Sequence, residues 1–253
     1  MVFLKKLGKA FLMCLSMFSI IPCPQVWDEV AFGLVIPLLP VVGAIIGALW
    51  YGFYILLAWL HTPLVLCTGL LLLFPLFISG FIHIDGMMDT SDAIFSRASL
   101  EKRRAILKDP NVGAFAVIAL CVYLLLGFSS VYTVLENSVN TMPLLTIPIL
   151  ARCVSGTALL NCDPISETGF AASFKQNTKP AHIAVLMVIA ACCLLLGFIS
   201  GDNVSLVILF GLIAAGICLA WHCTRQLGGI SGDLCGFIIT GSELFALILW
   251  AVL

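Results

Sequence analysis

Three aspartates lie close together in the stretch HIDGMMDTSD, residues 83–92, directly after an apolar run long enough to cross a membrane. Acidic residues are scarce elsewhere, since the whole chain of 253 residues contains only 13 of them. Asp85, Asp89 and Asp92 are spaced i, i+4 and i+7, which puts them within about 60° of one another on a helix. Carboxylates on one stripe repel each other unless cations or protons neutralise them. The spacing therefore favours a magnesium site that handles phosphate groups, with these three aspartates as ligands, because Mg²⁺ prefers oxygen donors.

Two neighbours of the aspartates are further candidates. Gly86 has no side chain, which permits a phosphate or another helix to approach Asp85 closely. His83 is a candidate for contact with metal or phosphate, and an ordinary interfacial histidine is the alternative. A simpler interpretation of the whole stretch is a solvated helix start, whose acids lie near the positive end of the helix dipole.

A basic run, RASLEKRRAILKDP, follows at residues 97–110. Its Arg97, Arg104 and Lys108 are candidates for phosphate contacts, because the forked guanidinium group of Arg matches the geometry of phosphate oxygens. The alternative is that the run only anchors a membrane protein on its inner side.

Two further polar segments interrupt the apolar sequence. Arg152 lies within an apolar run, where a charge is expensive and requires an acidic partner or an anionic ligand. The segment RQLGGISGDLCG, residues 225–236, is glycine-rich and can offer backbone N–H groups to an anion. Its Asp233 is a candidate catalytic residue, with a helix N-cap as the alternative. The candidate substrate-binding residues of these regions are Arg152, Glu167, Gly232 and Glu243.

Composition identifies the class of protein. The chain is 62% hydrophobic and 10% charged, with a mean hydropathy of +1.17. Soluble domains are about 45–50% apolar and about 25% charged, so this is a polytopic membrane protein in contact with lipid.

A net charge of −1 gives no basic surplus for nucleic acid. The eleven cysteines form no CxxC pair, which indicates small buried apolar residues instead of a metal or disulfide framework.

Apolar runs long enough to cross a membrane predict an all-α bundle of about seven transmembrane helices. The predicted spans are 31–60, 63–82, 112–135, 142–161, 181–200, 203–221 and 234–253. An N-terminal amphipathic helix at 1–22 is expected to lie in the membrane interface. The whole chain, 1–253, is expected to be one integral-membrane domain.

The distribution of basic residues predicts the orientation. With the N-terminus inside, eleven of the twelve Lys and Arg residues fall in inner segments, and the twelfth is Arg152. The positive-inside rule then gives an N-in, C-out arrangement in the cytoplasmic membrane. The polar segments share the cytoplasmic side, so 83–111 is expected to be a cytoplasmic catalytic loop and helix. Whether the chain forms a homo-oligomer is left open by the sequence.

The order of these motifs resembles a known family. The segments are, in order, HIDGMMDTSDAIFSR, EKRRAILKDPNVGAFAVIAL, an Arg within a span followed by ETGF, and LGGISGD with ELF near the C-terminus. Together they resemble the cobalamin synthase family. Its members are also called adenosylcobinamide-GDP ribazoletransferases. The match runs in order through essentially the whole chain, so it is far more specific than any single motif.

The resemblance implies an activity. Adenosylcobinamide-GDP would be joined to α-ribazole or its 5′-phosphate, with release of GMP, in a Mg²⁺-dependent late step of cobalamin synthesis at the inner membrane. Asp85 and Asp89 would hold Mg²⁺ on the diphosphate of this substrate. Asp92 or Asp233 would support a second metal or accept the proton of the attacking hydroxyl.

Two alternatives use the same residues differently. CDP-alcohol phosphotransferases use aspartates in the same way, but Met87-Met88-Asp89 departs from their DG-x-x-AR signature. An ion-coupled transporter would place its carboxylates at the bilayer midplane, between broken helices or repeats. Metal-dependent release of GMP would separate the proposed enzyme from a transporter.

Overall fold

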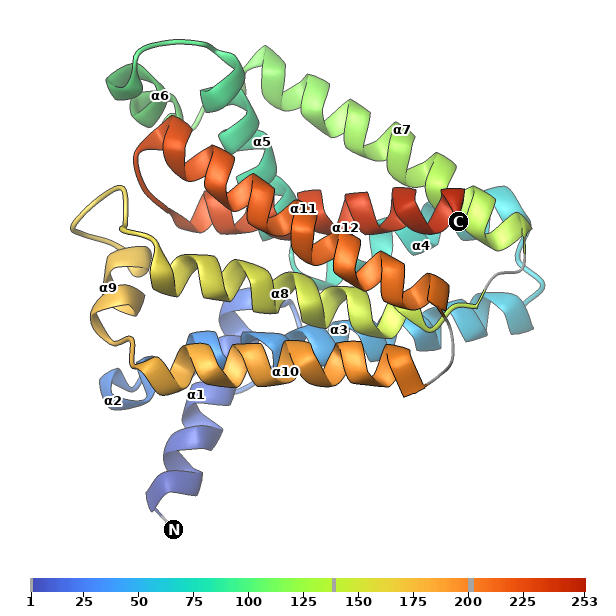
Figure 1. Ribbon diagram of the computed structural model, residues 1–253, viewed down its shortest axis with the longest axis horizontal. Coiled ribbons are helices and arrows are strands. Elements are labelled where there is room, and N and C mark those ends of the chain that lie inside the picture. The colour runs from blue at the N-terminus through green and yellow to red at the C-terminus, as the bar shows by residue number, and fades with distance from the viewer. Residues whose placement is uncertain (1, 138–139, 200–202) are drawn as a thin grey trace.

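The computed structural model describes residues 2–137, 140–199 and 203–253, and these residues form twelve helices. Six of the described helices are long and apolar enough to cross a membrane, and they follow the long axis of the molecule in Figure 1. A helix rises about 1.5 Å per residue, so about 20 residues suffice for a hydrocarbon core of about 30 Å. The predicted all-α polytopic membrane bundle is confirmed. The six helices are α3 (Val35–Trp59), α7 (Ala114–Glu136), α8 (Pro143–Asn161), α10 (Pro180–Ile199), α11 (Asn203–Leu227) and α12 (Gly232–Val252).

The second predicted span, 63–82, differs from the structure. Helix α4 (Leu64–Ile78) has only 15 residues, and the chain then bends by 90° into α5 (Ile82–Phe95). Gly80 and Phe81 make the bend with φ angles of 65° and 61°, in the left-handed region that ends a right-handed helix. The apolar pattern continues through this bend, so hydropathy alone does not reveal it. The described chain has seven crossings only if α4 and α5 count as one bent span.

The N-terminal helix is partly inside the bundle. Helix α1 (Val2–Phe18) buries Ala10, Met13 and Cys14, whereas Phe3 and Leu4 are exposed near its start. Figure 1 shows this first part projecting from the rest of the molecule. The expected helix is therefore present, but its second half packs against other helices. Its location in the membrane interface stays a prediction.

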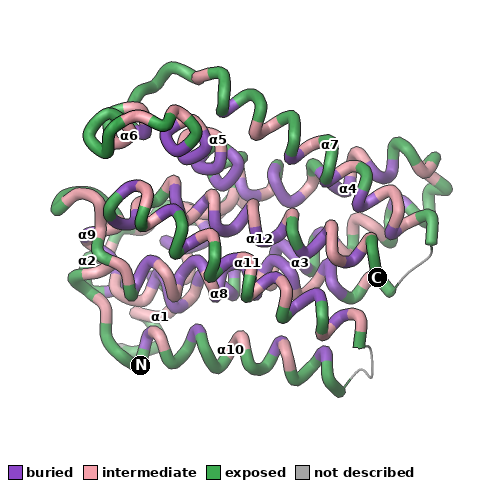
Figure 2. Tube along the Cα trace, turned by 45° about the horizontal axis from the view of Figure 1, so that its top comes forward, coloured by how far each residue is buried: buried purple, intermediate pink, exposed green. Residues whose placement is uncertain are grey.

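Small residues let the central helices approach closely. Gly43 and Gly47 of α3 form a Gly-xxx-Gly pattern that faces α8. A Cβ atom on Gly43 would lie 2.6 Å from the carbonyl oxygen of Pro148, and one on Gly47 would lie 2.5 Å from that of Leu145. Such contact replaces the hydrophobic effect as a source of packing energy between helices in lipid. Helices α8 and α12 are the most buried of the six, and Figure 2 shows them in the interior.

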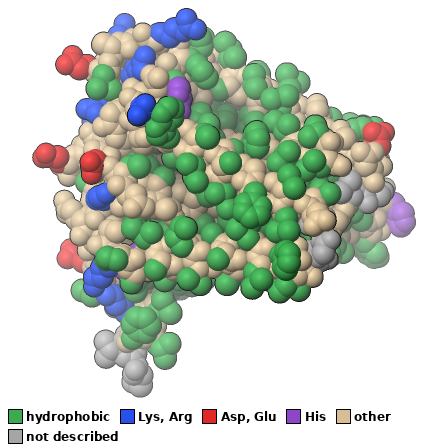
Figure 3. All heavy atoms as spheres, viewed as in Figure 1, with side chains coloured by type: hydrophobic (Ala, Val, Ile, Leu, Met, Phe, Trp, Pro, Cys, Tyr) green, Lys and Arg blue, Asp and Glu red, His purple; other side chains and the backbone are tan. Residues whose placement is uncertain are grey.

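Charged side chains gather at one end of the bundle. Figure 3 shows most of the visible Lys and Arg side chains at the end where the short helices lie, and a broad apolar surface beside them. These short helices are α2 (Glu29–Phe32), α6 (Leu100–Ile106) and α9 (Phe170–Gln176). The basic segments therefore share one face, as the sequence predicts. That this face is cytoplasmic stays a prediction.

Candidate active site

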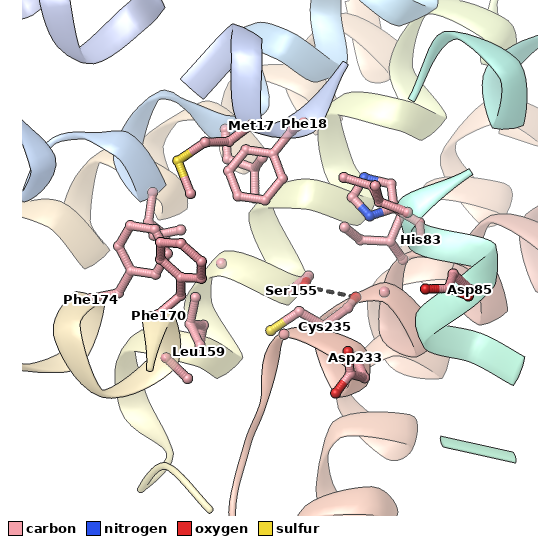
Figure 4. Close-up of a pocket in the computed structure, with 18 residues that line it drawn as sticks. Met17, Phe18, His83, Asp85, Ser155, Leu159, Phe170, Phe174, Asp233 and Cys235 are labelled. Carbon is pink, nitrogen blue, oxygen red and sulfur yellow. Dashed lines mark hydrogen bonds between the residues drawn. The ribbon is translucent and has the colours of Figure 1, made fainter. Parts of the chain in front are cut away.

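A cavity of about 400 Å³ opens among α1, α3, α5, α8, α9 and α12 near the charged end of the bundle. Asp85 of α5 and Asp233 of α12 line one side of it, as Figure 4 shows. Phe18 of α1 lines another wall, together with Phe170 and Phe174 of α9. The cavity thus joins carboxylates to an aromatic wall, and its residues come from segments far apart in the sequence.

Close contact between α5 and α12 brings the aspartates together. A Cβ atom on Gly86 would lie 2.7 Å from the backbone oxygen of Asp233 and 2.8 Å from its Cα atom. In the other direction, a Cβ atom on Gly236 would lie 2.9 Å from the backbone oxygen of His83. Both helices therefore need glycine where they cross. Of the two approaches that Gly86 permits, the structure shows the approach of another helix.

The four aspartates form one electrostatic unit. The charges of Asp85, Asp233 and Asp92 all act on the half-buried carboxyl of Asp89, and the charge of Asp85 acts on Asp233. Such crowding is unfavourable unless a cation compensates it. Within the described ranges, no three His, Cys, Asp or Glu side chains converge closely enough to enclose a metal ion by themselves. The oxygen-rich donor set fits Mg²⁺, which takes one or two protein carboxylates and completes its shell with phosphate oxygens and water.

Asp92 has a partner outside this group. The backbone N–H of Phe115 donates a hydrogen bond of 3.2 Å to its Oδ1 atom. Gly113, the N-cap residue of α7, leaves room for the carboxylate, because a Cβ atom there would collide with both Asp92 oxygens. An acceptor at this place satisfies one of the free N–H groups at the helix start. The structure thus gives Asp92 a capping role, and its role as a metal ligand stays a prediction.

The glycine-rich segment between α11 and α12 is held at both ends. Gly228 and Gly229 end α11 with φ angles of 70° and 156°, and the N–H of Gly229 donates to the carbonyl of Thr224 at 3.1 Å. This is a Schellman-type helix end, for which glycine is the preferred residue. Ser231 then caps α12 by accepting a hydrogen bond from the N–H of Leu234 at 3.3 Å. The exposed Gly232 and half-buried Asp233 follow in the first turn. The N-cap is therefore Ser231, and the alternative that Asp233 is the N-cap is wrong.

The loop before α9 stabilises this segment. The N–H of Ile230 donates to the carbonyl of Asp163 at 2.8 Å, and the N–H of Ile165 donates to the carbonyl of Ile230 at 2.9 Å. The same loop carries Glu167, which is exposed. The loop that carries Glu167 and the glycine-rich segment, which are far apart in the sequence, are thus neighbours in the structure.

The basic run contributes to the same region. Arg104 donates from Nε to the carbonyl of Leu227 at 2.8 Å and from Nη2 to that of Gly228 at 3.1 Å. Arg103 donates to the backbone and side-chain oxygens of Gln226. Cations at the end of α11 satisfy free carbonyls and interact favourably with the helix dipole. Arg104 therefore supports the glycine-rich segment.

The other two candidates from this run lie on the surface. Arg97 and Lys108 are exposed, and Arg97 has a left-handed φ of 53°. Contact of Arg97, Arg104 or Lys108 with phosphate stays a prediction.

Arg152 and Glu243 pair with each other. Their Nη1 and Oε1 atoms are 3.0 Å apart, and both side chains are buried, at 2% and 9% exposure. Arg152 Nη1 also donates to the carbonyl of Pro148 at 3.0 Å. Of the partners that the sequence predicts for Arg152, an acidic residue or an anionic ligand, the structure shows an acidic residue, Glu243. Neither residue lines the cavity described above, so a substrate-binding role for either stays a prediction.

Sequence reasoning did not single out the aromatic side of the cavity. Phe18, Phe170 and Phe174 look like any other apolar residues in a membrane protein. Phe174 is fixed by stacking on Phe32, with ring centroids 4.4 Å apart. Lys175 holds α9 in place by donating to the carbonyl of Asn161, the last residue of α8, at 2.8 Å. The only signal is the aromatic residue that follows the Glu-Thr-Gly stretch at 167–169.

Fold and site together define a helical membrane protein whose acidic cavity lies at one end of its bundle. The profile of the family described as cobalamin-5-phosphate synthase matches residues 10–251. The chain belongs to this family.

Curated relatives agree with the family assignment. The adenosylcobinamide-GDP ribazoletransferase of Clostridium perfringens strain 13 is 37% identical over 248 residues, covering 97% of this chain and 98% of the relative. The protein of the same name from Clostridium botulinum strain Alaska E43 is 34% identical, covering 96% and 97%. That from Geobacillus thermodenitrificans strain NG80-2 is 32% identical, covering 98% and 96%. No solved structure matches the chain significantly.

Proposed function

We propose that this protein joins adenosylcobinamide-GDP to α-ribazole or α-ribazole 5′-phosphate and releases GMP, in a Mg²⁺-dependent reaction on the cytoplasmic side of the inner membrane. The observation that carries the proposal is the convergence of Asp85 and Asp233 at one cavity, through the glycine contacts between α5 and α12. The names of the relatives supply the substrates. Basic residues at the same end of the bundle support the cytoplasmic side.

The reaction is a displacement at phosphorus. A ribose hydroxyl of the acceptor forms a bond to the phosphorus on the cobinamide side of the diphosphate, and the bond to the GMP oxygen breaks. GMP leaves with that electron pair. Catalysis of this kind depends mainly on positioning and on stabilising charge.

The residues divide the work as follows. Asp85 and Asp89, assisted by Asp233, would hold Mg²⁺, which when bound neutralises charge on the diphosphate. Asp233 lines the cavity and is the candidate that accepts the proton of the attacking hydroxyl. The exposed Arg97 and Lys108 would attract the phosphate groups from solution.

The test uses purified protein in lipid nanodiscs with adenosylcobinamide-GDP and α-ribazole 5′-phosphate, with and without Mg²⁺. We expect GMP release, matched by a complete corrinoid, only with Mg²⁺. Asp89→Asn should lower the rate by about 100-fold or more, because loss of a charge that binds the metal is worth several kcal/mol in the transition state. Glu136→Gln, at the exposed end of α7, is the matched control and should keep full activity.

Two results would contradict the proposal. An Asp89→Asn protein that inserts normally and keeps full activity would remove the role of the aspartates in holding Mg²⁺. Release of GMP without incorporation of α-ribazole would indicate a hydrolase or a different acceptor.

A further inference from the structure

The cavity has two chemically different sides. Asp85 and Asp233 provide charge at one side, next to the exposed Gly232. The aromatic side carries Phe18, Phe170 and Phe174, and Figure 4 shows these rings away from the two aspartates. A ligand that fills the whole cavity must therefore have a charged or polar part and a flat apolar part. α-Ribazole has this composition, because a dimethylated benzimidazole is joined to a ribose.

His83 places an imidazole beside Phe18, between the aromatic side and the carboxylates. The residue lines the cavity and is only 6% exposed. Its Nε2 atom is buried and has no hydrogen-bond partner among the described residues. Its ring lies nearly parallel to that of Phe18, at 23°, with centroids 6.4 Å apart. An unpaired buried nitrogen is costly, so a ligand that offers it an acceptor would be favoured. Because Nε2 has almost no surface open to the cavity, the His83 ring must turn for the two to pair.

The number of polar groups matches a benzimidazole. Once joined to ribose, this base has one free ring nitrogen, which accepts a hydrogen bond, and its remaining edge is apolar. His83 offers one donor when its hydrogen is on Nε2. The hydroxyl of Ser155, which also lines the cavity, already donates to the carbonyl of Cys235 at 3.1 Å. One donor and one acceptor are thus available to pair.

Other parts of the substrates fit this wall less well. Guanine carries several donors and acceptors, and most of them would lose their partners among phenylalanines. A complete corrinoid is too large for about 400 Å³, a volume typical of sites for one small ligand. The corrinoid and GDP must then approach from the carboxylate side.

We propose that the aromatic side of the cavity binds the base of the acceptor, with Phe18 and Phe174 packing on the ring and His83 donating to its free nitrogen. This assignment rests on the proposed function and makes His83 a residue that selects the base. The ribose of the acceptor then points toward Asp233, where its hydroxyl can react.

The first experiment measures binding without catalysis. Equilibrium dialysis of 5,6-dimethylbenzimidazole against the protein in nanodiscs gives its affinity for wild type, Phe18→Leu, Phe174→Leu and Phe74→Leu. The control is matched, because Phe74 stacks on Phe53 with centroids 4.5 Å apart, much as Phe174 stacks on Phe32, but lies outside the cavity. We expect Phe18→Leu and Phe174→Leu to weaken binding about fivefold to tenfold and Phe74→Leu to leave it unchanged.

The second experiment isolates the hydrogen bond of His83. His83→Met keeps the volume and removes the donor. It should weaken binding of 5,6-dimethylbenzimidazole but not of 5,6-dimethylindole, which has a carbon in place of the accepting nitrogen. In the transferase assay, His83→Met and Phe174→Leu should raise KM for α-ribazole 5′-phosphate about fivefold or more and leave KM for adenosylcobinamide-GDP unchanged.

The outcomes separate this inference from the proposed function. If wild type is an active transferase but the three cavity variants bind the base and use the acceptor as Phe74→Leu does, the inference is wrong and the function stands. If wild type binds the base through these residues without transferring it, the function is wrong, and only base binding on the aromatic side stands. If wild type neither binds the base nor transfers it, both are wrong.

Discussion

At the scale of single residues, the carboxylates of the acidic stretch do different work. Asp85 lines the cavity, and the half-buried Asp89 is close enough to the other three carboxylates for their charges to act on it. Asp92 turns to the start of α7 and accepts a backbone hydrogen bond there. The structure therefore divides this stripe, because Asp85 lines the cavity whereas Asp92 caps a helix.

This division predicts different results for the same substitution. Asp92→Asn keeps an oxygen that can accept the hydrogen bond from Phe115, so we expect at least about half of wild-type transferase activity. Asp92→Ala removes the acceptor and should cost about 1 kcal/mol of stability, as loss of a helix cap does. Activity assays and thermal unfolding in nanodiscs measure both effects. A folded Asp92→Asn protein as inactive as Asp89→Asn would instead make Asp92 a metal ligand.

At the scale of helices, the site depends on how closely α5 and α12 approach. Glycines at their crossing let the backbone of one helix touch the other, and the aspartates follow from that contact. The distance between Asp85 and Asp233 is therefore set by residues that carry no functional group. This is a constraint on backbone separation, which side-chain motion cannot easily compensate.

Gly86→Ala should separate these helices. The added methyl group would lie 2.7 Å from the backbone oxygen of Asp233, so the helices must move apart. We expect a loss of stability of about 1–3 kcal/mol and a fall in activity of about tenfold or more. Gly52→Ala is the control, since a Cβ atom there meets no heavy atom within 4 Å. Equal activity in both variants would show that the crossing distance has no influence on the reaction.

At the scale of the whole molecule, the buried pair of Arg152 and Glu243 connects the two central helices α8 and α12. Two charges in the membrane interior are tolerated only as partners. Arg152→Met should destabilise the protein by about 3–5 kcal/mol, because Glu243 is left buried and unpaired. The double variant with Glu243→Leu should recover most of that stability.

The double variant also tests the expected substrate contacts of this pair. If the pair is purely structural, KM values of Arg152→Met/Glu243→Leu should stay within about twofold of wild type. Restored thermal stability together with a large rise in KM would show that Arg152 or Glu243 binds substrate.

Features of the fold and site that depend on local properties of the sequence can be predicted from it, whereas tertiary contacts cannot. The apolar runs predict the bundle, because length and hydropathy are local properties, and the aspartate spacing correctly predicts one helix for Asp85, Asp89 and Asp92. The bend at Gly80 and Phe81 is not readable from hydropathy, since Ser79 and Gly80 interrupt the apolar run only briefly. The partner of Asp92 and the aromatic wall of the cavity are tertiary contacts. In lipid, a phenylalanine that lines a cavity and one that faces the membrane produce the same apolar pattern.

The separation of α5 from α12 along the chain has a consequence for biosynthesis. More than half of the sequence lies between them, and a membrane protein is inserted from its N-terminus as it is translated. Asp85 and Asp89 therefore reach the membrane long before Asp233 does. The nascent protein therefore cannot assemble its acidic cavity until the ribosome has delivered α12, near the end of synthesis.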